Sequence, residues 1–349
     1  MKKLLIGLLT FCSLSISAHA NNTTESVSES QPNKSFVWGT YGQDAAQIPG
    51  SRVANNTPIN TPVLVKFIND NHIQTFNFII RDSAVNGKRI QGLEYTNFVN
   101  FLEATKDSKI KVWITLVPPS EIEPGWTGSF AAQTGLLGDD EVDLVDAIKA
   151  DAKDYKTWFK LCSLVASKYP NFVGVNIDDF INNVDDDFWY SNKFFTAQML
   201  QQMKSNLRFY NTSNLSFIAT TYIGRTVGEV YTITKKDSTW LKAIDVMLLY
   251  DEKYLEPTTT FKMKASNVRE QIAAVTDVSV AQKLSIVAGI YIWGASWYQY
   301  ATPSKDYVRE TMEYAKSSLD GAMIYRTTPP TSDYGSVVYP FFEEWDRSQ

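Results

Sequence analysis

The chain has 349 residues, 44% of them hydrophobic and 13% aromatic, and it carries a formal net charge of −5. This acidic balance, without a run of basic residues, argues against a nucleic-acid partner, because contact with a phosphate backbone depends on Lys and Arg. The 315 residues from position 35 onward are enough for one large α/β domain with a sizeable core.

The first 20 residues predict a signal peptide. Lys2 and Lys3 precede a short apolar stretch over residues 4–16, and Ala18-His19-Ala20 has the small-x-small pattern of a cleavage site. The apolar stretch is shorter than the ~20 residues that a membrane-spanning helix needs. We therefore expect residues 1–20 to be removed and the mature chain to be secreted or periplasmic, with no membrane segment.

Cleavage after Ala20 also limits the chemistry of the mature chain. It removes Cys12, which the bulky Phe11 makes a poor lipidation site. One cysteine, Cys162, and one histidine, His72, remain, so disulfides within the chain and His-rich or Cys2His2-type metal sites are excluded by count. We expect no cofactor. His72 follows a predicted helix over residues 62–71 and precedes a strand, so we interpret it as a surface histidine.

Residues 21–34 are polar and without periodicity, which indicates a flexible leader. From Ser35 onward, short apolar runs alternate with longer helical ones, which is typical of βα units around a parallel sheet. A doubly wound sheet would place a glycine-rich phosphate loop after the first strand, and the sequence has none there. Residues 35–349 therefore predict a single (β/α)8 TIM barrel. Its eight predicted strands are Phe36–Tyr41, Thr75–Arg81, Ile110–Leu116, Phe172–Asp178, Leu215–Tyr222, Ile244–Tyr250, Leu284–Ile292 and Gly321–Arg326.

Several helices can be predicted from caps and spacing. Thr61 is predicted to be the N-cap of the first helix, with Pro62 in its first turn. Trp158, Phe159 and Cys162 recur at helical spacing, which indicates packing residues. These three residues belong to the clearest predicted helix, Asp151–Tyr169. The other clear helices are Ser191–Tyr210, Ser266–Val275 and Lys305–Ser318. Two long connections, over residues 117–150 and 253–264, are expected to shape a binding cleft.

Acidic and aromatic residues stand at the predicted carboxyl ends of the strands, where a barrel carries its active site. Rings stack on the apolar faces of sugars, and paired carboxylates supply the acid and the base or nucleophile of glycosidic cleavage. The sequence therefore predicts a carbohydrate substrate or ligand. The candidates are Asp82 after the second strand, Asn176, Asp178 and Asp179 on the fourth, Tyr222 on the fifth, Tyr250 and Asp251 on the sixth, Trp293 after the seventh, and Tyr325 and Arg326 on the eighth. Trp38, inside the first strand, fits either the barrel core or a sugar subsite.

The fourth strand is the most informative. Gly174, Asn176 and Asp178 share one face of it, and we expect that face to line the barrel axis. Asp178 and Asp179 then diverge at its tip, and two neighbouring carboxyl groups suit acid–base work. The alternative is structural: either residue caps the following loop or bonds Arg326 or Arg81.

Here the sequence resembles family 18 chitinases and related glycosidases. Residues 172–180 (FVGVNIDDF) are similar to their fourth-strand pattern FDGIDIDWE, and residues 248–251 (LLYD) to their sixth-strand Met-x-Tyr-Asp. Residues 321–325 (GAMIY) resemble their eighth-strand Gly-x-Met-x-Trp, with Tyr in place of the Trp that floors a sugar subsite. Residues 111–115 (KVWIT) resemble the start of their third strand, without its Ser-x-Gly-Gly ending.

The departures from this pattern concern the catalytic acid. The family's general acid is the final Glu of the fourth-strand motif, and this chain has Phe180 there. Of the three aspartates before it, only Asp178 is kept, because Val173 and Asn176 replace the others. The resemblance implies that Asp178, helped by Tyr250 and Asp251, orients an acetamido group of the substrate, and that the acid itself is missing.

Three functions follow as alternatives. In the first, the protein is a glycoside hydrolase in which Asp179 is the general acid and Asp178 or Asp251 is the nucleophile or base. In the second, it is a non-catalytic barrel that binds glycan, as a chitinase-like lectin would. In the third, Asp82 joins these three carboxylates around Ca²⁺ or Mg²⁺, with the acidic residues 185–187 nearby. We favour the hydrolase, because these carboxylates exceed what binding alone requires.

Overall fold

The computed structural model describes residues 37–41, 48, 50–53, 57–80, 83–85, 88–90, 93–116, 155–184, 194–210, 212, 215–223, 238–251, 261–292 and 303–348. All of them belong to one compact unit, Lys34–Gln349. The expected signal peptide, the leader, the connection 117–150 and most of the connection 253–264 lie outside the described residues, and they stay predictions.

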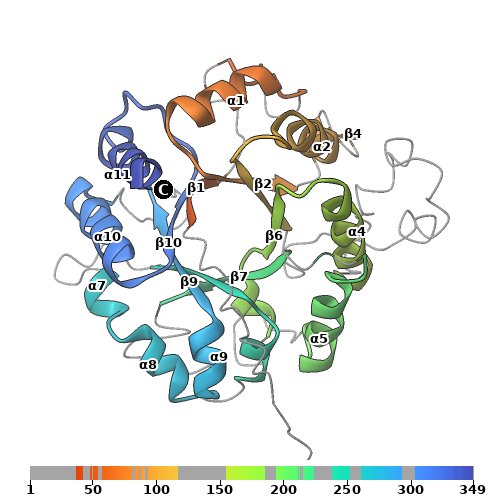
Figure 1. The fold of residues 1–349 in the computed structure, drawn as a ribbon, viewed down its shortest axis with the longest axis vertical. Coiled ribbons are helices and arrows are strands. Elements are labelled where there is room, and N and C mark those ends of the chain that lie inside the picture. The colour runs from red at the N-terminus through yellow and green to blue at the C-terminus, as the bar shows by residue number, and fades with distance from the viewer. Residues whose placement is uncertain are drawn as a thin grey trace, which may run out of the picture. The chain divides into compact units, whose positions relative to one another are not determined.

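Eight parallel strands close into a barrel in the order β1-β10-β9-β8-β7-β6-β5-β2 (Figure 1). The closed sheet confirms the TIM barrel and rules out the doubly wound alternative. All eight predicted strands are present within two residues of their expected ends. They are β1 Val37–Tyr41, β2 Thr75–Ile80, β5 Lys111–Leu116, β6 Phe172–Ile177, β7 Ser216–Tyr222, β8 Val246–Tyr250, β9 Ser285–Tyr291 and β10 Gly321–Tyr325. A hairpin of β3 Ser83–Val85 and β4 Lys88–Ile90, which was not predicted, follows β2.

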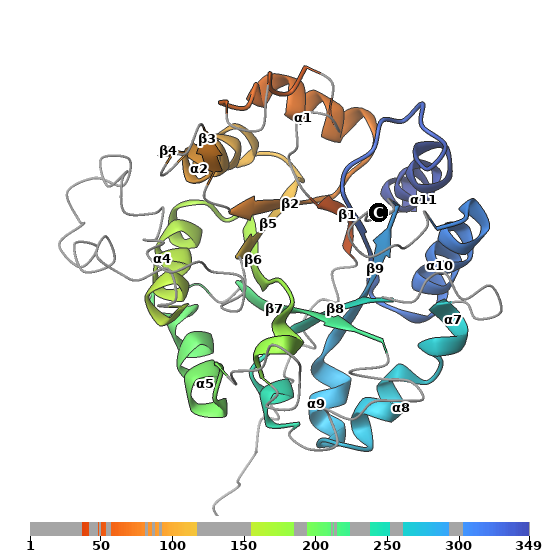
Figure 2. The ribbon, with the colours of Figure 1, turned by 180° about the vertical axis from the view of Figure 1, so that it is seen from behind.

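The helices ring the barrel on its outside, as the views from both sides show (Figures 1 and 2). The predicted helix at 305–318 is confirmed in full. The helix predicted over Ser191–Tyr210 begins later than expected: Thr196 is its N-cap, and the Thr196 side chain accepts a hydrogen bond from the Met199 amide. The assignment of Thr61 as N-cap was wrong: Asn60 has that position, and Thr61 is the first helical residue. The helices are α1 Thr61–Asp70, α2 Leu93–Thr105, α4 Tyr155–Lys168, α5 Ala197–Asn206, α7 Phe261–Lys264, α8 Val268–Ala273, α9 Val278–Lys283, α10 Lys305–Ser318 and α11 Gly335–Ser348, with 3-10 turns η4 Phe180–Asn183 and η5 Thr239–Lys242.

Aromatic side chains fill the space between the barrel wall and the helices. Phe76 and Phe78 of β2 contact Phe101 of α2, with ring centroids 5.6 Å and 5.0 Å away. Trp38 of β1 lies against Phe342 and Trp345 of α11 and is 1% exposed, so it is a packing residue and not a subsite. Each such ring contributes roughly 1.5–3 kcal/mol by leaving water. Trp158, Phe159 and Cys162 are buried in the same way, as predicted.

A belt of polar side chains crosses the barrel interior. The Thr115 hydroxyl donates to Asn77 Oδ1 over 2.9 Å, and Asn176 Nδ2 donates to the Thr115 and Thr220 hydroxyls over 3.0 Å each. All four residues are buried, and each makes at least one of these hydrogen bonds, which offset the cost of burying a polar group. Asn77 Nδ2 is buried and has no hydrogen-bond partner among the described residues. The belt confirms that the Asn176 face of β6 lines the interior.

The amino ends of the strands carry a repeated ionic support. The Asp245 carboxylate, just before β8, accepts from the Phe217 amide of β7 over 3.0 Å and from Lys204 of α5 over 2.8 Å. Asp320, just before β10, likewise accepts from the Ile286 amide of β9 and from Arg269 of α8. In both cases one carboxylate ties a strand start, the neighbouring strand and an outer helix together, which fits the stabilising role of this end of a barrel.

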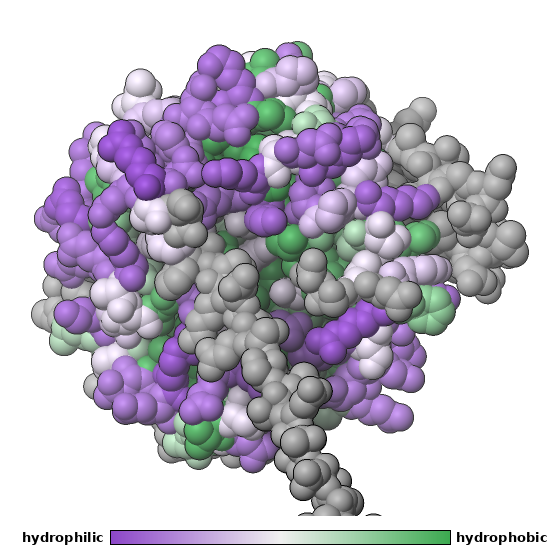
Figure 3. Space-filling view, in the orientation of Figure 1, coloured by the Kyte–Doolittle hydropathy of each residue, from purple (hydrophilic) through white to green (hydrophobic). Residues whose placement is uncertain are grey.

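His72 is a satisfied surface residue, as predicted. Its Nδ1 lies 2.9 Å from Asp346 Oδ2, so the ring joins the end of α1 to α11. Much of the face drawn in Figure 3 is hydrophilic, with hydrophobic residues toward its centre. Within the described part of the chain, no helix has the length and apolar character needed to cross a membrane.

Candidate active site at the carboxyl ends of the strands

Four tyrosines meet at the carboxyl ends of neighbouring strands, and we call them the tyrosine cluster. They are Tyr222 of β7, Tyr250 of β8, Tyr291 of β9 and Tyr325 of β10. The ring of Tyr250 lies 4.8 Å from that of Tyr291 and 6.2 Å from that of Tyr325, and 6.5 Å from that of Tyr222. The structure thus brings together three residues that the sequence selected and a fourth, Tyr291, that it did not. Tyr291 could have been found from the sequence, because it lies at the carboxyl end of the predicted seventh strand, where the other aromatic candidates were sought.

Asp178 and Asp179 stand beside this cluster at the end of β6, and both are half-buried. The Tyr222 hydroxyl donates a hydrogen bond to Asp179 Oδ1. Asp178 Oδ1 accepts from the Asp179 amide over 3.1 Å. The Asp179 carbonyl in turn accepts from Asn182 and Asn183, each over 3.1 Å. Both residues are therefore held at defined places beside the tyrosine cluster.

A left-handed residue makes this arrangement. Asp179 has φ 42°, a conformation that costs a non-glycine residue energy and that concentrates at functional sites. It turns the chain from β6 into η4, so that Phe180 leaves the barrel mouth and is buried. The Phe180 ring stacks on Phe195 at 5.6 Å and touches Trp240 at 5.5 Å. At the position of the resembling family's general acid, this chain therefore carries a core residue.

Burial sets the ionisation of the tyrosines. It raises the pKa of Tyr222, Tyr250 and Tyr291 well above the usual 10.0, and neighbouring tyrosines and carboxylates, Asp178 in all three cases, raise it further. These hydroxyls consequently stay protonated and act as hydrogen-bond donors at neutral pH. The Tyr250 hydroxyl is buried and finds no hydrogen-bond partner within the described residues. A buried donor of this kind is a natural contact for a bound ligand.

Asp251 has a different environment from the pair on β6. It is 2% exposed, and Lys264 Nζ of α7 lies 2.9 Å and 3.1 Å from its two carboxylate oxygens. The Tyr307 hydroxyl of α10 donates to it over 2.9 Å. Since Tyr250 points into the cluster, strand alternation directs Asp251 toward these outer helices. These contacts join Asp251 to the outer helices α7 and α10.

The remaining candidates are placed as follows. Asn176 lies in the polar belt below the mouth and is fully buried. Arg326 has φ 69°, and its guanidinium carbon lies 6.0 Å from the centre of the Tyr325 ring. Asp82 and Trp293 lie outside the described residues, as do Arg81 and the acidic cluster 185–187. Among the residues that the structure describes, no group of three or more His, Cys, Asp or Glu side chains could hold a metal ion.

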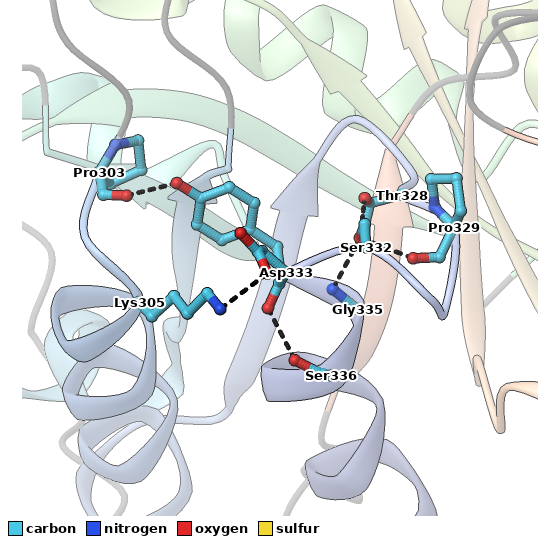
Figure 4. A network of polar contacts seen from close by, with 9 residues as sticks. Pro303, Lys305, Thr328, Pro329, Ser332, Asp333, Gly335 and Ser336 are labelled. Carbon is cyan, nitrogen blue, oxygen red and sulfur yellow. Dashed lines mark hydrogen bonds and ion pairs between the residues drawn. The ribbon is translucent and has the colours of Figure 1, made fainter.

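The connection from β10 to α11 is fastened to α10 beside the mouth (Figure 4). The Tyr334 hydroxyl donates to the Pro303 carbonyl over 2.5 Å, and Lys305 pairs with Asp333 over 2.8 Å. Ser332 joins the Pro329 carbonyl to the Gly335 amide, which starts α11. This network gives the segment that follows Arg326 a fixed path.

No family model and no curated protein matches the chain. Several solved structures match the chain in fold. An endo-β-1,4-mannanase from Thermotoga petrophila is 10% identical, covers 91% of this chain and 78% of its own, and has a TM-score of 0.53. An endo-1,4-β-mannanase from Rhizomucor miehei is 12% identical over 89% of this chain and 95% of its own, also with a TM-score of 0.53. A GH18 chitinase from Pseudoalteromonas aurantia is 13% identical over 89% and 98%, with a TM-score of 0.45. The resemblance to glycoside hydrolase barrels is thus confirmed at the level of the fold.

Proposed function

We propose that the protein is an exported glycoside hydrolase that cleaves a glycosidic bond of an oligo- or polysaccharide at the mouth of the barrel. The observation that carries this proposal is the pairing of Asp178 and Asp179, both half-buried, with the tyrosine cluster, because acid–base groups next to aromatic rings are what sugar cleavage needs. The mannanase and chitinase barrels support the choice of substrate class by analogy of fold.

The two carboxyl groups divide the reaction between them. Asp179, in its acid form, gives its proton to the glycosidic oxygen as the bond from that oxygen to the anomeric carbon breaks. The Asp178 carboxylate faces the positive charge that develops on the sugar and either bonds the anomeric carbon or takes a proton from the attacking water. Asp251 has no direct part in these steps, because Lys264 and Tyr307 already occupy its carboxylate.

Other residues of the mouth bind the sugar. The Tyr250 hydroxyl donates to a polar group of the substrate, since it is buried and has no partner among the described residues. Tyr325 offers its half-buried ring to an apolar sugar face, and the Arg326 guanidinium lies over that ring, 6.0 Å from its centre. Asn176 supports the mouth from below through its bonds to Thr115 and Thr220. Asp82 and Trp293 stay candidates for further contacts.

A second function is favoured by one observation, the burial of Phe180 among Phe195 and Trp240. A barrel that has replaced a catalytic Glu by a core residue could retain its cleft for binding alone. In that case the tyrosine cluster recognises a glycan, and Asp178 and Asp179 only hydrogen-bond to it.

The test is release of reducing ends or of a chromogenic aglycone from a panel of polysaccharides and aryl glycosides. The mature protein is compared with Asp178→Asn and Asp179→Asn, and with Asp277→Asn, a control at an exposed aspartate at the start of α9. We expect each mouth variant to lose about 100-fold or more in kcat and the control to match the wild type. No turnover, together with glycan binding that survives both changes, would instead establish the binding protein. Loss of activity with a chelator would point to the metal-dependent alternative.

A further inference from the structure

We infer that Tyr222 is a positioning residue for Asp179: its hydroxyl fixes the carboxyl group in the orientation that proton transfer to the substrate requires. This inference rests on the proposed function. It assigns to Tyr222 a role other than the sugar contact that a ring at a strand end first suggests.

The position of Tyr222 makes it a rigid donor. It is the last residue of β7, next to β6 in the barrel, and it is 5% exposed. Its backbone is fixed on the other side by β8, because the Ile223 amide donates to the Tyr250 carbonyl over 2.8 Å. A phenol has a single proton to donate, and here that proton goes to Asp179 Oδ1.

Asp179 is fixed from its own side as well. Its carbonyl accepts hydrogen bonds from Asn182 and Asn183, which hold its left-handed backbone. The next residue, Phe180, is buried in the core and fixes the backbone on that side. With Oδ1 occupied by Tyr222, the second oxygen, Oδ2, is the one left to carry the proton. When that proton passes to the substrate, a charge appears on the carboxylate, and a hydrogen bond to a charged acceptor is stronger than one to a neutral acceptor. The bond therefore strengthens in the transition state, which is the condition for it to raise kcat.

The groups around Tyr222 and Asp179 keep the Tyr222 hydroxyl protonated, so that it can donate a hydrogen bond. Burial raises the pKa of Tyr222 well above 10.0, and Tyr291, Asp179 and Asp178 each raise it further. The ring of Tyr250 lies 6.5 Å from that of Tyr222. The phenol proton is consequently present throughout the range in which a glycosidase with two carboxyl groups works.

The experiment is a double-mutant cycle in turnover, with wild type, Tyr222→Phe, Asp179→Asn and the double variant. Tyr222→Phe keeps the ring and removes only the donor. We expect it to lower kcat by about 10- to 100-fold with KM changed by less than about twofold. In the Asp179→Asn background the same change should lower kcat by less than about twofold, because Tyr222 acts through Asp179. Tyr314→Phe, which removes a half-buried hydroxyl from the Ala265 carbonyl on the outer helices, is the matched control.

A wild-type kcat for Tyr222→Phe, or losses that multiply in the double variant, would overturn the positioning role while leaving the proposed function intact. A wild type that turns over no glycan contradicts the proposed function first. The same four proteins then serve in calorimetric titration with the glycan that binds. Non-additive losses of affinity would retain Tyr222 as the residue that positions Asp179 for binding, and additive losses would reject it.

Discussion

The ring of Tyr250 lies directly over Gly289 of the neighbouring strand. A Cβ atom placed on Gly289 would come within 2.5 Å of three ring carbons of Tyr250, which is too close for carbon atoms that are not bonded to each other. The glycine therefore leaves the space that lets Tyr250 turn into the mouth and meet Tyr291. A residue without a side chain thus determines where a candidate ligand donor is placed.

Gly289→Ala tests this relationship. The added methyl group forces the Tyr250 ring to move, and overpacking of this kind typically lowers the free energy of unfolding by about 1–3 kcal/mol. Turnover or glycan affinity should fall with it, because the Tyr250 hydroxyl leaves its place. Urea unfolding and an activity or binding assay measure the two effects. Ser285→Ala, at the other end of β9, is the control and should change neither by a notable amount.

Asp251 and Lys264 make a second prediction, which separates structural from catalytic carboxylates. Asp251→Ala removes the carboxylate that pairs with Lys264, whose side chain is 14% exposed. Loss of one member of a buried pair costs about 3–5 kcal/mol, so the free energy of unfolding should fall by that order in urea. Changing both residues, as Asp251→Leu with Lys264→Met, should recover much of the loss. If a folded Asp251→Asn protein has no turnover while its stability is unchanged, Asp251 belongs to the chemistry after all.

The two carboxylates that support the amino ends of the strands, Asp320 and Asp245, should differ in how much they contribute to the free energy of unfolding. Asp320 has a side chain that is 5% exposed, whereas that of Asp245 is 31% exposed. Asp320→Ala should therefore lower the free energy of unfolding more than Asp245→Ala, because the Ile286 amide is left buried and unpaired at a cost of about 1–3 kcal/mol. Thermal or urea unfolding of the two variants measures the order. Equal effects would mean that burial of the carboxylate does not decide its contribution. Turnover should be retained in both, because this end lies opposite the mouth.

Sequence reasoning succeeded where short-range periodicity decides the outcome. The alternation of apolar runs located all eight strands, and the rule that barrel sites lie at strand ends selected Tyr222, Tyr250 and Tyr325, which do meet. It also placed Asn176 on the inner face of β6. What it could not supply is how deep each inner residue lies: Asn176 is covered by the layer above it and reaches the belt rather than the mouth.

Contacts between residues that lie far apart in the chain could not be predicted from the sequence. Asp251 is held by Tyr307, which lies 56 residues later on an outer helix, and no local pattern signals that pairing. The direction of Phe180 depends on the left-handed turn at Asp179, which a pair of adjacent aspartates does not announce. In both cases the partners come from another segment of the chain: α10 supplies Tyr307 to Asp251, and Phe195 and Trp240 pack on Phe180.

The tyrosine cluster predicts how stability depends on alkaline pH. Tyr222, Tyr250 and Tyr291 have their pKa raised well above 10.0 in the folded chain, first by burial and then by neighbouring tyrosines or carboxylates. The folded state therefore holds these protons more tightly than the unfolded state. Their contribution is fully present below pH 10 and is lost as the pH rises above it, by about 1.4 kcal/mol per pH unit for each tyrosine.

Tyr250→Phe removes one of these titrating groups, so its free energy of unfolding should fall less steeply with pH above 10 than that of the wild type. Urea unfolding at a series of alkaline pH values gives the two slopes. Absorbance at 295 nm, which reports tyrosinate, should show the cluster ionising only as the protein unfolds. Equal slopes for the two proteins would mean that Tyr250 ionises in the folded state as readily as in the unfolded one. Its hydroxyl would then lie in water, which would also remove the reason for treating it as a buried donor to the ligand.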